Sequence, residues 1–211
     1  MKKIVIENVT KKFKNELVLD NVSVSFNSGK IIGIVGVNGS GKTVLLRLIS
    51  GLMKPTTGSI YIDDKKMHKD LDFPESIGVV IEKPAFFEEF TGYKNLQILR
   101  DIKKLISDEE VLHYLSLVGL KNDNKPVSKY SVGMKQRLAF AQSIMESPEL
   151  LALDEFTSGI DEDGIDMMFD IIRAYKDENR LIILSSHHRE DIDSLCDEVY
   201  KISKGKIERI R

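Results

Sequence analysis

The sequence predicts an α/β fold with a block of helices inserted into its middle. Four short runs are apolar without interruption, as expected for strands of a sheet that is covered on both faces. These runs are Ile31–Val35, Ile77–Ile81, Leu150–Leu153 and Leu181–Leu184. Between the second and third runs, from Thr91 to Met145, apolar residues instead recur at helical spacing. We therefore expect one compact unit, residues 1–211, with a helical subdomain at approximately 91–146.

The N-terminal segments have the character of short strands. Ile4–Ile6 is a β-like run, and Val22–Phe26 alternates apolar and polar residues, as a strand with one exposed face does. Pro55–Gly58 has the composition of a turn, and the strand Ser59–Ile62 is expected after it.

Several helix and turn signals follow. Ser107 and Glu110 have the spacing of a capping box, and Gly119 is expected to end the helix that they begin. A further helix is expected at residues 163–176. The tail, residues 198–210, alternates about Lys204–Lys206 and is expected to form a terminal hairpin.

Composition excludes several classes of function. Of 211 residues, 42% are hydrophobic and 30% are charged, and the net charge of −2 gives no general attraction to nucleic acid or anionic lipid. The single cysteine, Cys196, cannot form an internal disulfide, which fits a reducing cytosol, and we assign it no role. No apolar run approaches the roughly 18–20 residues that span a bilayer, and the N-terminus lacks the apolar stretch of a signal peptide. A membrane role would therefore require a partner.

The most informative motif follows the run Ile31–Val35 and reads Gly36-Val37-Asn38-Gly39-Ser40-Gly41-Lys42-Thr43. It has the form G-x-x-x-x-G-K-[ST] of a phosphate-binding loop, and an apolar, helix-like segment comes after it. The glycines let successive N–H groups converge on one anion, and the helix directs the positive end of its dipole at that anion. Lys42 supplies a cation for the outer phosphates, and the Thr43 hydroxyl can bind Mg²⁺. A chance glycine turn would not combine these features, so we predict a nucleoside triphosphate site at Gly36, Asn38, Gly39, Ser40, Gly41, Lys42 and Thr43.

Two carboxylates, Asp154 and Glu155, end the buried run Leu150–Leu153. In nucleotide hydrolases an acid at such a strand end holds Mg²⁺ through water. A second acid beside it can act as the general base for the attacking water. Two acids after a strand can also be an ordinary loop face, but the phosphate loop upstream favours the functional interpretation. We predict Thr43 and Asp154 as metal ligands and Glu155 as the catalytic base.

Between these two motifs, residues 130–141 read YSVGMKQRLAFA. This segment closely resembles the signature of ATP-binding-cassette (ABC) ATPases, L-S-G-G-Q followed by a helix rich in Gln and Arg. The order of motifs also matches, and the resemblance covers essentially the whole chain. It implies a P-loop NTPase core with an N-terminal antiparallel β subdomain and an inserted α-helical subdomain. It also implies that two cassettes dock head to tail, so that Ser131 and Gly133 of one hold the ATP bound by the loop of the other. Ser131 can cap the helix that follows it.

Three further assignments rest on the same resemblance. Thr157–Asp161 corresponds to the family's dimer-contact loop. His187 corresponds to the histidine that contacts the γ-phosphate, with His188 as the alternative. Phe13 corresponds to an aromatic residue that stacks on adenine, although a lone phenylalanine between two strands is more often part of a core.

The chain departs from the family pattern in two places. Glu82 stands where the family has a glutamine, and an ionised carboxylate accepts hydrogen bonds but cannot donate them. A nearby Mg²⁺ would outweigh the repulsion between Glu82 and phosphate, so we predict Glu82 as an acceptor to the metal or its water. A surface glutamate with no such role is the alternative. In the signature, Val132 and Met134 replace glycine and glutamine. Both departures resemble cassettes of bacterial exporters for lantibiotics and bacitracin-like peptides.

Phe86 and Phe87 directly follow this sensor loop. Two adjacent aromatics in a loop cannot easily both join the core, so we expect one to be exposed. In ABC transporters this region forms, with the helical subdomain, a groove for a cytoplasmic helix of the membrane subunit. A small satellite core under the helical subdomain is the alternative.

The resemblance therefore implies the ATP-binding and ATP-hydrolysing subunit of a bacterial ABC transporter that exports an antimicrobial peptide or drug, with ATP and Mg²⁺ as cofactors. The implied partners are a polytopic membrane permease and a second cassette, identical or not, at the cytoplasmic face of the membrane. One alternative is a non-transport ABC ATPase that acts on DNA or ribosomes, but the chain lacks the coiled-coil insertion or basic linker usual there, and we expect no nucleic-acid partner. The other is a cassette that binds ATP with little hydrolysis.

Overall fold

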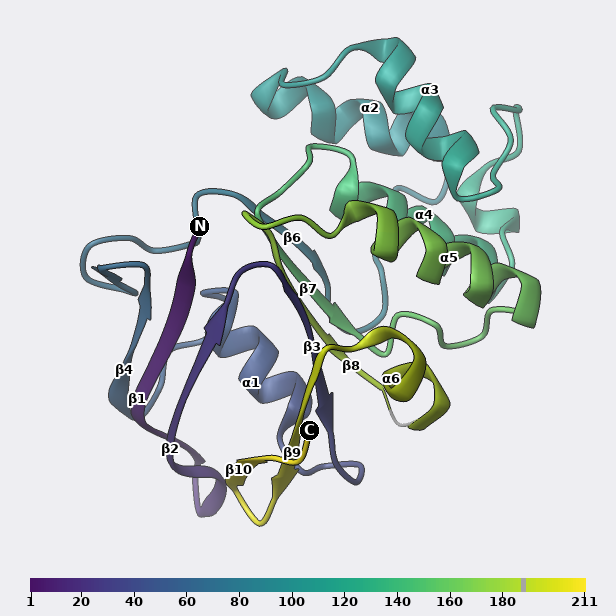
Figure 1. The fold of residues 1–211 in the computed structure, drawn as a ribbon. Helices are drawn as coiled ribbons and strands as arrows, with labels where there is room; N and C mark the ends of the chain where they lie inside the picture. Colours follow the sequence, from purple (N-terminus) through teal and green to yellow (C-terminus); the bar gives the residue numbers. More distant parts are fainter. Residues whose placement is uncertain (187–188) are drawn as a thin grey trace.

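The computed structural model describes residues 1–186 and 189–211, and its strands form two sheets (Figure 1). The N-terminal sheet has four strands in the order β2-β1-β4-β5, and all its pairs are antiparallel. Its strands are β1 (Lys3–Phe13), β2 (Glu16–Asn27), β4 (Thr57–Ile62) and β5 (Lys65–Lys66). The expected antiparallel β subdomain is therefore confirmed.

The central sheet has six strands in the order β10-β9-β3-β8-β7-β6. Neighbouring strands in this sheet are parallel, except that β9 and β10 at its edge are antiparallel. The strands are β3 (Lys30–Val35), β6 (Ile77–Val80), β7 (Leu150–Asp154), β8 (Leu181–Ser185), β9 (Glu198–Ser203) and β10 (Lys206–Arg209). All four uninterrupted apolar runs lie in this sheet. The expected hairpin joins β9 to β10, where Lys204 and Gly205 both have positive φ, as such two-residue turns require.

Helices cover both faces of the central sheet (Figure 1). They are α1 (Lys42–Ile49), α2 (Gly92–Lys103), α3 (Asp108–Leu117), α4 (Val132–Ile144), α5 (Glu162–Tyr175) and α6 (Arg189–Leu195), with a 3₁₀ turn at Val127–Lys129. The capping box of Ser107 and Glu110 is formed at the start of α3, and Gly119 follows its end with φ 71°. Both details agree with the sequence. Among the described residues, no helix is both long and apolar enough to cross a bilayer.

The two faces of the central sheet belong to two separate hydrophobic cores. Along β3, Ile31 packs with the helical subdomain and α5, whereas Ile32 packs with α1 and the N-terminal sheet. Along β7, Leu151 belongs to the same core as Ile31, and Leu150 belongs to the same core as Ile32. Successive side chains of a strand point to opposite faces, so an unbroken apolar run supplies both cores at once. This arrangement places α1 between the two sheets.

Several elements were not expected in full, among them β2, which begins at Glu16 and not at Val22. Strand β1 extends to Phe13, far beyond Ile6. Its pairing with β2 continues past a register shift between Ile6 and Val9. Asn8 lies at this irregularity with φ 51°, so the apolar alternation is interrupted although the strand continues. The two-residue strand β5 and the short helix α6 were also not expected.

An ionic cluster around the buried carboxylate of Glu198 joins the beginnings of β3 and β9. Glu198 accepts a hydrogen bond from the Lys30 ammonium, one of 3.0 Å from the Tyr200 hydroxyl, and lies 3.3 Å from the Arg209 guanidinium. Burial alone would raise the pKa of the Glu198 carboxyl. The hydrogen bonds from Lys30 and Tyr200 outweigh this effect and hold the pKa of Glu198 below its ordinary value.

We expect Glu198→Gln to lower the free energy of unfolding by about 2 kcal/mol at neutral pH, because hydrogen bonds to a charged group are lost. A depressed pKa means that this stabilisation is present above the unfolded-state pKa of about 4.3 and is lost as the pH falls through the folded-state value. Urea denaturation at pH 7 measures the loss of unfolding free energy, and the same experiment at about pH 3 shows whether that loss diminishes in acid. The exposed Glu208→Gln on β10 is the control, and a Glu198→Gln deficit that persists undiminished in acid would contradict the assignment.

Candidate active site

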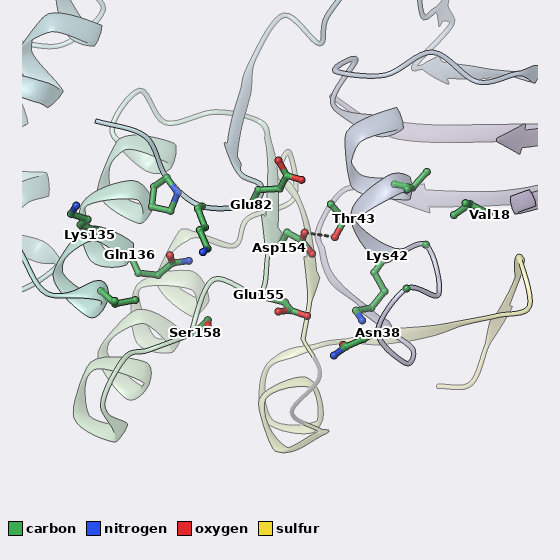
Figure 2. A pocket seen from close by; sticks show the side chains of 16 residues that line it. Val18, Asn38, Lys42, Thr43, Glu82, Lys135, Gln136, Asp154, Glu155 and Ser158 are labelled. Atoms are coloured by element: carbon green, nitrogen blue, oxygen red, sulfur yellow. Dashed lines mark hydrogen bonds between the residues drawn. The ribbon is translucent and has the colours of Figure 1, made fainter. Parts of the chain in front are cut away.

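A cavity of about 1110 Å³ opens at the carboxyl ends of the parallel strands (Figure 2). Its wall is formed by the glycine-rich loop with α1, the segment after β6, the end of β7 and the first turns of α4. Eight residues predicted as site residues line it: Asn38, Gly39, Gly41, Lys42, Thr43, Glu82, Asp154 and Glu155. Residues that are far apart in the sequence therefore share one wall.

The loop before α1 leaves polar groups of its own unsatisfied. Gly41 is the N-cap of α1 with φ 108°, in the left-handed region, and none of the described side chains caps the first N–H groups of that helix. The hydroxyl of Ser40 is buried, and among the described residues it has no hydrogen-bond partner. An uncapped helix N-terminus that opens into a cavity is chemically suited to an anion such as phosphate.

The Lys42 side chain lies across the inside of this loop. It is only 5% exposed, and its ammonium donates to the carbonyl oxygens of Gly36 at 2.9 Å and Val37 at 3.4 Å. Two neutral carbonyls compensate a buried ammonium less well than an anion would. The cation is thus available to a ligand that carries negative charge.

Asp154 joins the loop to the central sheet at the end of β7. Its Oδ2 accepts a hydrogen bond of 2.5 Å from the Thr43 hydroxyl (Figure 2). Its Oδ1 accepts a hydrogen bond from Ser185 at the end of β8. Asp154 is 7% exposed. A hydroxyl and a carboxylate are hard oxygen donors of the kind that Mg²⁺ prefers. Within residues 1–186 and 189–211, no three acidic, histidine or cysteine side chains gather as a metal cage. Mg²⁺ commonly needs only one or two protein oxygens beside substrate phosphates, so this donor set fits it.

Glu155 leaves the strand direction immediately after Asp154. Its φ of 47° is left-handed, its N–H donates to the Ser185 carbonyl at 3.1 Å, and its own carbonyl accepts from Ser158 N–H at 3.1 Å. This sharp turn directs the half-buried carboxylate into the cavity that Lys42 also faces (Figure 2). Strained backbone of this kind is common where side chains are positioned for chemistry.

Glu82 lines the same cavity from the segment after β6. Its φ is 65°, its side chain is 59% exposed, and its Oε1 is ion-paired with the guanidinium of Arg47 on α1. The predicted role of Glu82 toward a metal remains a prediction.

A family model described as "ABC transporter" matches residues 19–158, which include the glycine-rich loop, the α4 segment and the Asp154–Glu155 pair. The chain belongs to the ABC transporter family. It is an ABC transporter ATPase. It is 48% identical to the uncharacterized ABC transporter ATP-binding protein YybJ of Bacillus subtilis, over 97% of this chain and 94% of YybJ.

Relatives with assigned transport roles are more distant. The lantibiotic transport ATP-binding protein SrtF of Streptococcus pyogenes is 36% identical over 96% of this chain and 87% of its own length. The bacitracin transport ATP-binding protein BcrA of Bacillus licheniformis is 36% identical over 95% of this chain and 66% of its own length.

The fold of the cassette is also that of a solved ABC protein. A dimeric structure of the ATP-binding cassette MJ0796, in a post-hydrolysis state bound to ADP and Pi, superimposes with a TM-score of 0.86 and 22% identity. The match covers 99% of both chains. The predicted fold class is therefore confirmed.

The signature segment of the cassette lies at the start of α4. Ser131 caps this helix, as expected, by accepting a hydrogen bond of 3.1 Å from Met134 N–H. Gly133 packs closely against the backbone of Gly159, since a Cβ atom at position 133 would lie 2.8 Å from the Gly159 carbonyl oxygen. Neither Ser131 nor Gly133 is among the described residues that line the cavity, whereas exposed Val132 is.

Among the described residues, the other predicted positions are not part of the cavity wall. Gly36 and Ser40 belong to the loop but are not among the lining residues, and Phe13 is 40% exposed with the Lys11 ammonium 4.9 Å from its ring centroid. His187 and its alternative His188 lie outside the described residues. The roles assigned to these positions remain predictions.

The structure adds contributors that the motifs did not indicate. Ser185 orients Asp154, and Val18 of β2 provides an apolar part of the wall. Gln136 on α4 is buried beside the cavity. Ser185 could have been noticed as the polar end of an apolar strand, like Asp154, and Gln136 stands within the signature segment without an assigned role. The packing of Val18 leaves no local mark in the sequence.

Proposed function

We propose that this cassette binds ATP with Mg²⁺ in the cavity and hydrolyses it to drive a membrane permease that exports an antimicrobial peptide or drug. The observation that carries the proposal is the convergence on one cavity of the uncapped α1 N-terminus, the Lys42 ammonium and the Thr43–Asp154 pair. These groups supply, in order, an anion site, a cation for the outer phosphates and hard oxygens for the metal.

The chemistry follows from these positions. The Lys42 ammonium gives up its hydrogen bonds to two loop carbonyls and donates to phosphate oxygens instead. These oxygens are negatively charged, so they compensate the ammonium better than the neutral carbonyls do. Thr43 and, through water, Asp154 would hold Mg²⁺, which neutralises developing negative charge on the phosphates. Glu155 accepts a proton from the water that attacks the γ-phosphorus, and the bond to the leaving ADP oxygen breaks. Ser185 and Thr43 keep Asp154 in place by hydrogen bonds.

We infer that the site is completed by a second cassette. Ser131 is exposed, it caps α4, and with Gly133 it does not face the cavity of its own chain. An exposed helix N-terminus of this kind suits the γ-phosphate of an ATP bound to another copy. The dimeric MJ0796 structures support this arrangement.

The proposed permease contact lies beside the sensor loop. Phe86 packs against the core under the helical subdomain, whereas Phe87 and Phe90 are exposed by 54% and 38% and their rings lie 5.8 Å apart. Asn95 holds this segment by accepting from Phe87 N–H at 2.8 Å and donating to its carbonyl at 3.0 Å. Exposed aromatics on a fixed backbone are typical of a protein interface. The names of SrtF and BcrA support a peptide as the exported substrate.

We expect the double substitution Phe87→Ser/Phe90→Ser to abolish permease binding without loss of ATP binding, because the exposed rings do not line the cavity. The experiment co-expresses the cassette with a candidate polytopic permease from its own host and measures co-purification and cellular resistance to lantibiotic and bacitracin-like peptides. Ile210→Ser, another exposed apolar position, is the control. If resistance is the same with and without the cassette, peptide export is wrong. Undiminished co-purification of the double variant would reject this surface.

A further inference from the structure

Arg47 and Thr43 form two parallel links from α1 to the central sheet. They are four residues apart, so they lie on the same face of the helix. Thr43 donates to Asp154 at the end of β7, and Arg47 pairs with Glu82 just after β6. Strands β6 and β7 are neighbours in parallel register, with Val80 opposite Leu153. One helix face thus contacts the ends of two adjacent strands, and both contacts end at carboxylates of the cavity wall.

The ion pair of Arg47 with Glu82 matters because the cavity wall carries several negative charges. Glu82, Asp154 and Glu155 are three carboxylates that line a cavity proposed to receive a polyphosphate. The Arg47 guanidinium compensates one of them from outside the wall. Its partner is Glu82, which departs from the neutral glutamine of the general family pattern described above.

The ion pair is poorly suited to a purely structural role. The side chains of Arg47 and Glu82 are 29% and 59% exposed, and exposed pairs of this kind add little to stability. An unpaired Glu82 would, however, repel a polyanion across the cavity. The effect of the pair is therefore expected in ligand binding and not in folding.

We propose that Arg47 is a positioning residue that neutralises Glu82 as long as no metal is bound, and thereby sets how strongly ATP binding depends on Mg²⁺. The inference rests on the proposed ATP and Mg²⁺ site. When Mg²⁺ is present, its charge compensates Glu82 as well, so Arg47 becomes less important. Part of this effect acts through Glu82, because without its Arg47 partner the exposed carboxylate is no longer held against α1. The rest is the direct attraction between the Arg47 charge and the phosphates, which remains when residue 82 is neutral.

A double-mutant cycle tests this coupling through ATP affinity, not turnover. Affinity of a fluorescent ATP analogue is measured in EDTA and in excess Mg²⁺ for wild type, Arg47→Gln, Glu82→Gln and the double variant. We expect Arg47→Gln to weaken binding in EDTA by about tenfold, the order given by one unit charge about 10 Å away at an effective dielectric of about 20. In Mg²⁺ the loss should shrink to about threefold or less. With Glu82→Gln present, the loss caused by Arg47→Gln in EDTA should be clearly smaller, because only the direct attraction between Arg47 and the phosphates is then removed.

Further variants exclude trivial causes. Arg47→Lys keeps the charge and should retain most of the affinity, and Arg173→Gln, which breaks an exposed pair with Asp170 on α5, should change nothing. Thermal unfolding identifies variants that fail to fold. An equal effect of Arg47→Gln in both backgrounds, or no effect in EDTA, overturns the proposal. If the wild type itself binds no ATP, the proposed function fails, which is a different outcome from an additive cycle.

Discussion

Replacing Lys42 by alanine is expected to lower ATP affinity by about 100-fold or more. Lys42 is buried, and among the residues that the structure describes its ammonium has only the carbonyls of Gly36 and Val37 as acceptors. A charge-assisted hydrogen bond to phosphate contributes up to about 3 kcal/mol, which corresponds to roughly two orders of magnitude in affinity. The alanine leaves the phosphates without that cation at the point where the α1 dipole also acts. Equilibrium binding of a fluorescent ATP analogue measures the loss.

The control for Lys42→Ala is Lys121→Ala, which removes an exposed lysine outside the cavity wall. It has the same effect on net charge, so it separates a local contact from a change in the overall field. Near-normal ATP affinity of a folded Lys42→Ala protein would refute the phosphate-loop assignment and, with it, the proposed site.

Glu155→Gln is expected to reduce ATP turnover by about 10²- to 10⁴-fold, the contribution typical of a general base. The amide keeps the size of the side chain but cannot accept the proton of the attacking water at neutral pH. ATP binding should survive, because the Lys42 ammonium and the Thr43–Asp154 pair are unchanged. Because each unhydrolysed ATP would bridge the two proposed cassettes, the variant should accumulate as an ATP-bound dimer. Phosphate release and light scattering with excess Mg²⁺ and ATP measure the two effects.

Glu162→Gln at the start of α5 is the matched control, because it neutralises an exposed glutamate outside the cavity wall. It should turn over ATP as the wild type does and should not accumulate as a dimer. A Glu155→Gln protein that binds ATP yet stays monomeric would contradict the shared site. Unchanged turnover would remove Glu155 from the catalytic role.

Strands β3, β6, β7 and β8 of the central sheet were predictable because both of their faces are covered by other parts of the protein. Runs such as Ile31–Val35 and Leu181–Leu184 are apolar at every position, and this signal does not depend on which elements pack against them. The end of β1 was not predictable, because Asn8 interrupts the alternation at a register shift. Helix α6 has seven residues, and it is held by Ile192 and Leu195, which pack into the core under the central sheet. So short a helix depends on tertiary contacts, which its own sequence does not reveal.

The site was predictable where each motif follows a parallel strand. Thr43 and Asp154 meet because the loop after β3 and the end of β7 lie at the same edge of one sheet, on either side of β8. The pair of Arg47 and Glu82 was not predictable, since it depends on how α1 is rotated over β6. Val18 enters the wall through the placement of the N-terminal sheet, which no motif encodes.

The two cores share strands, and this has a consequence for how heat or mutation inactivates the enzyme. Ile31 and Ile32 are adjacent on β3, and Leu150 and Leu151 are adjacent on β7, yet each pair supports opposite sides of the molecule. Loosening the packing on either side releases the same strands, and with them the backbone that carries Asp154 and the glycine-rich loop. A destabilised helix far from the cavity should therefore displace Asp154 and the glycine-rich loop from their positions at a temperature below that of global unfolding.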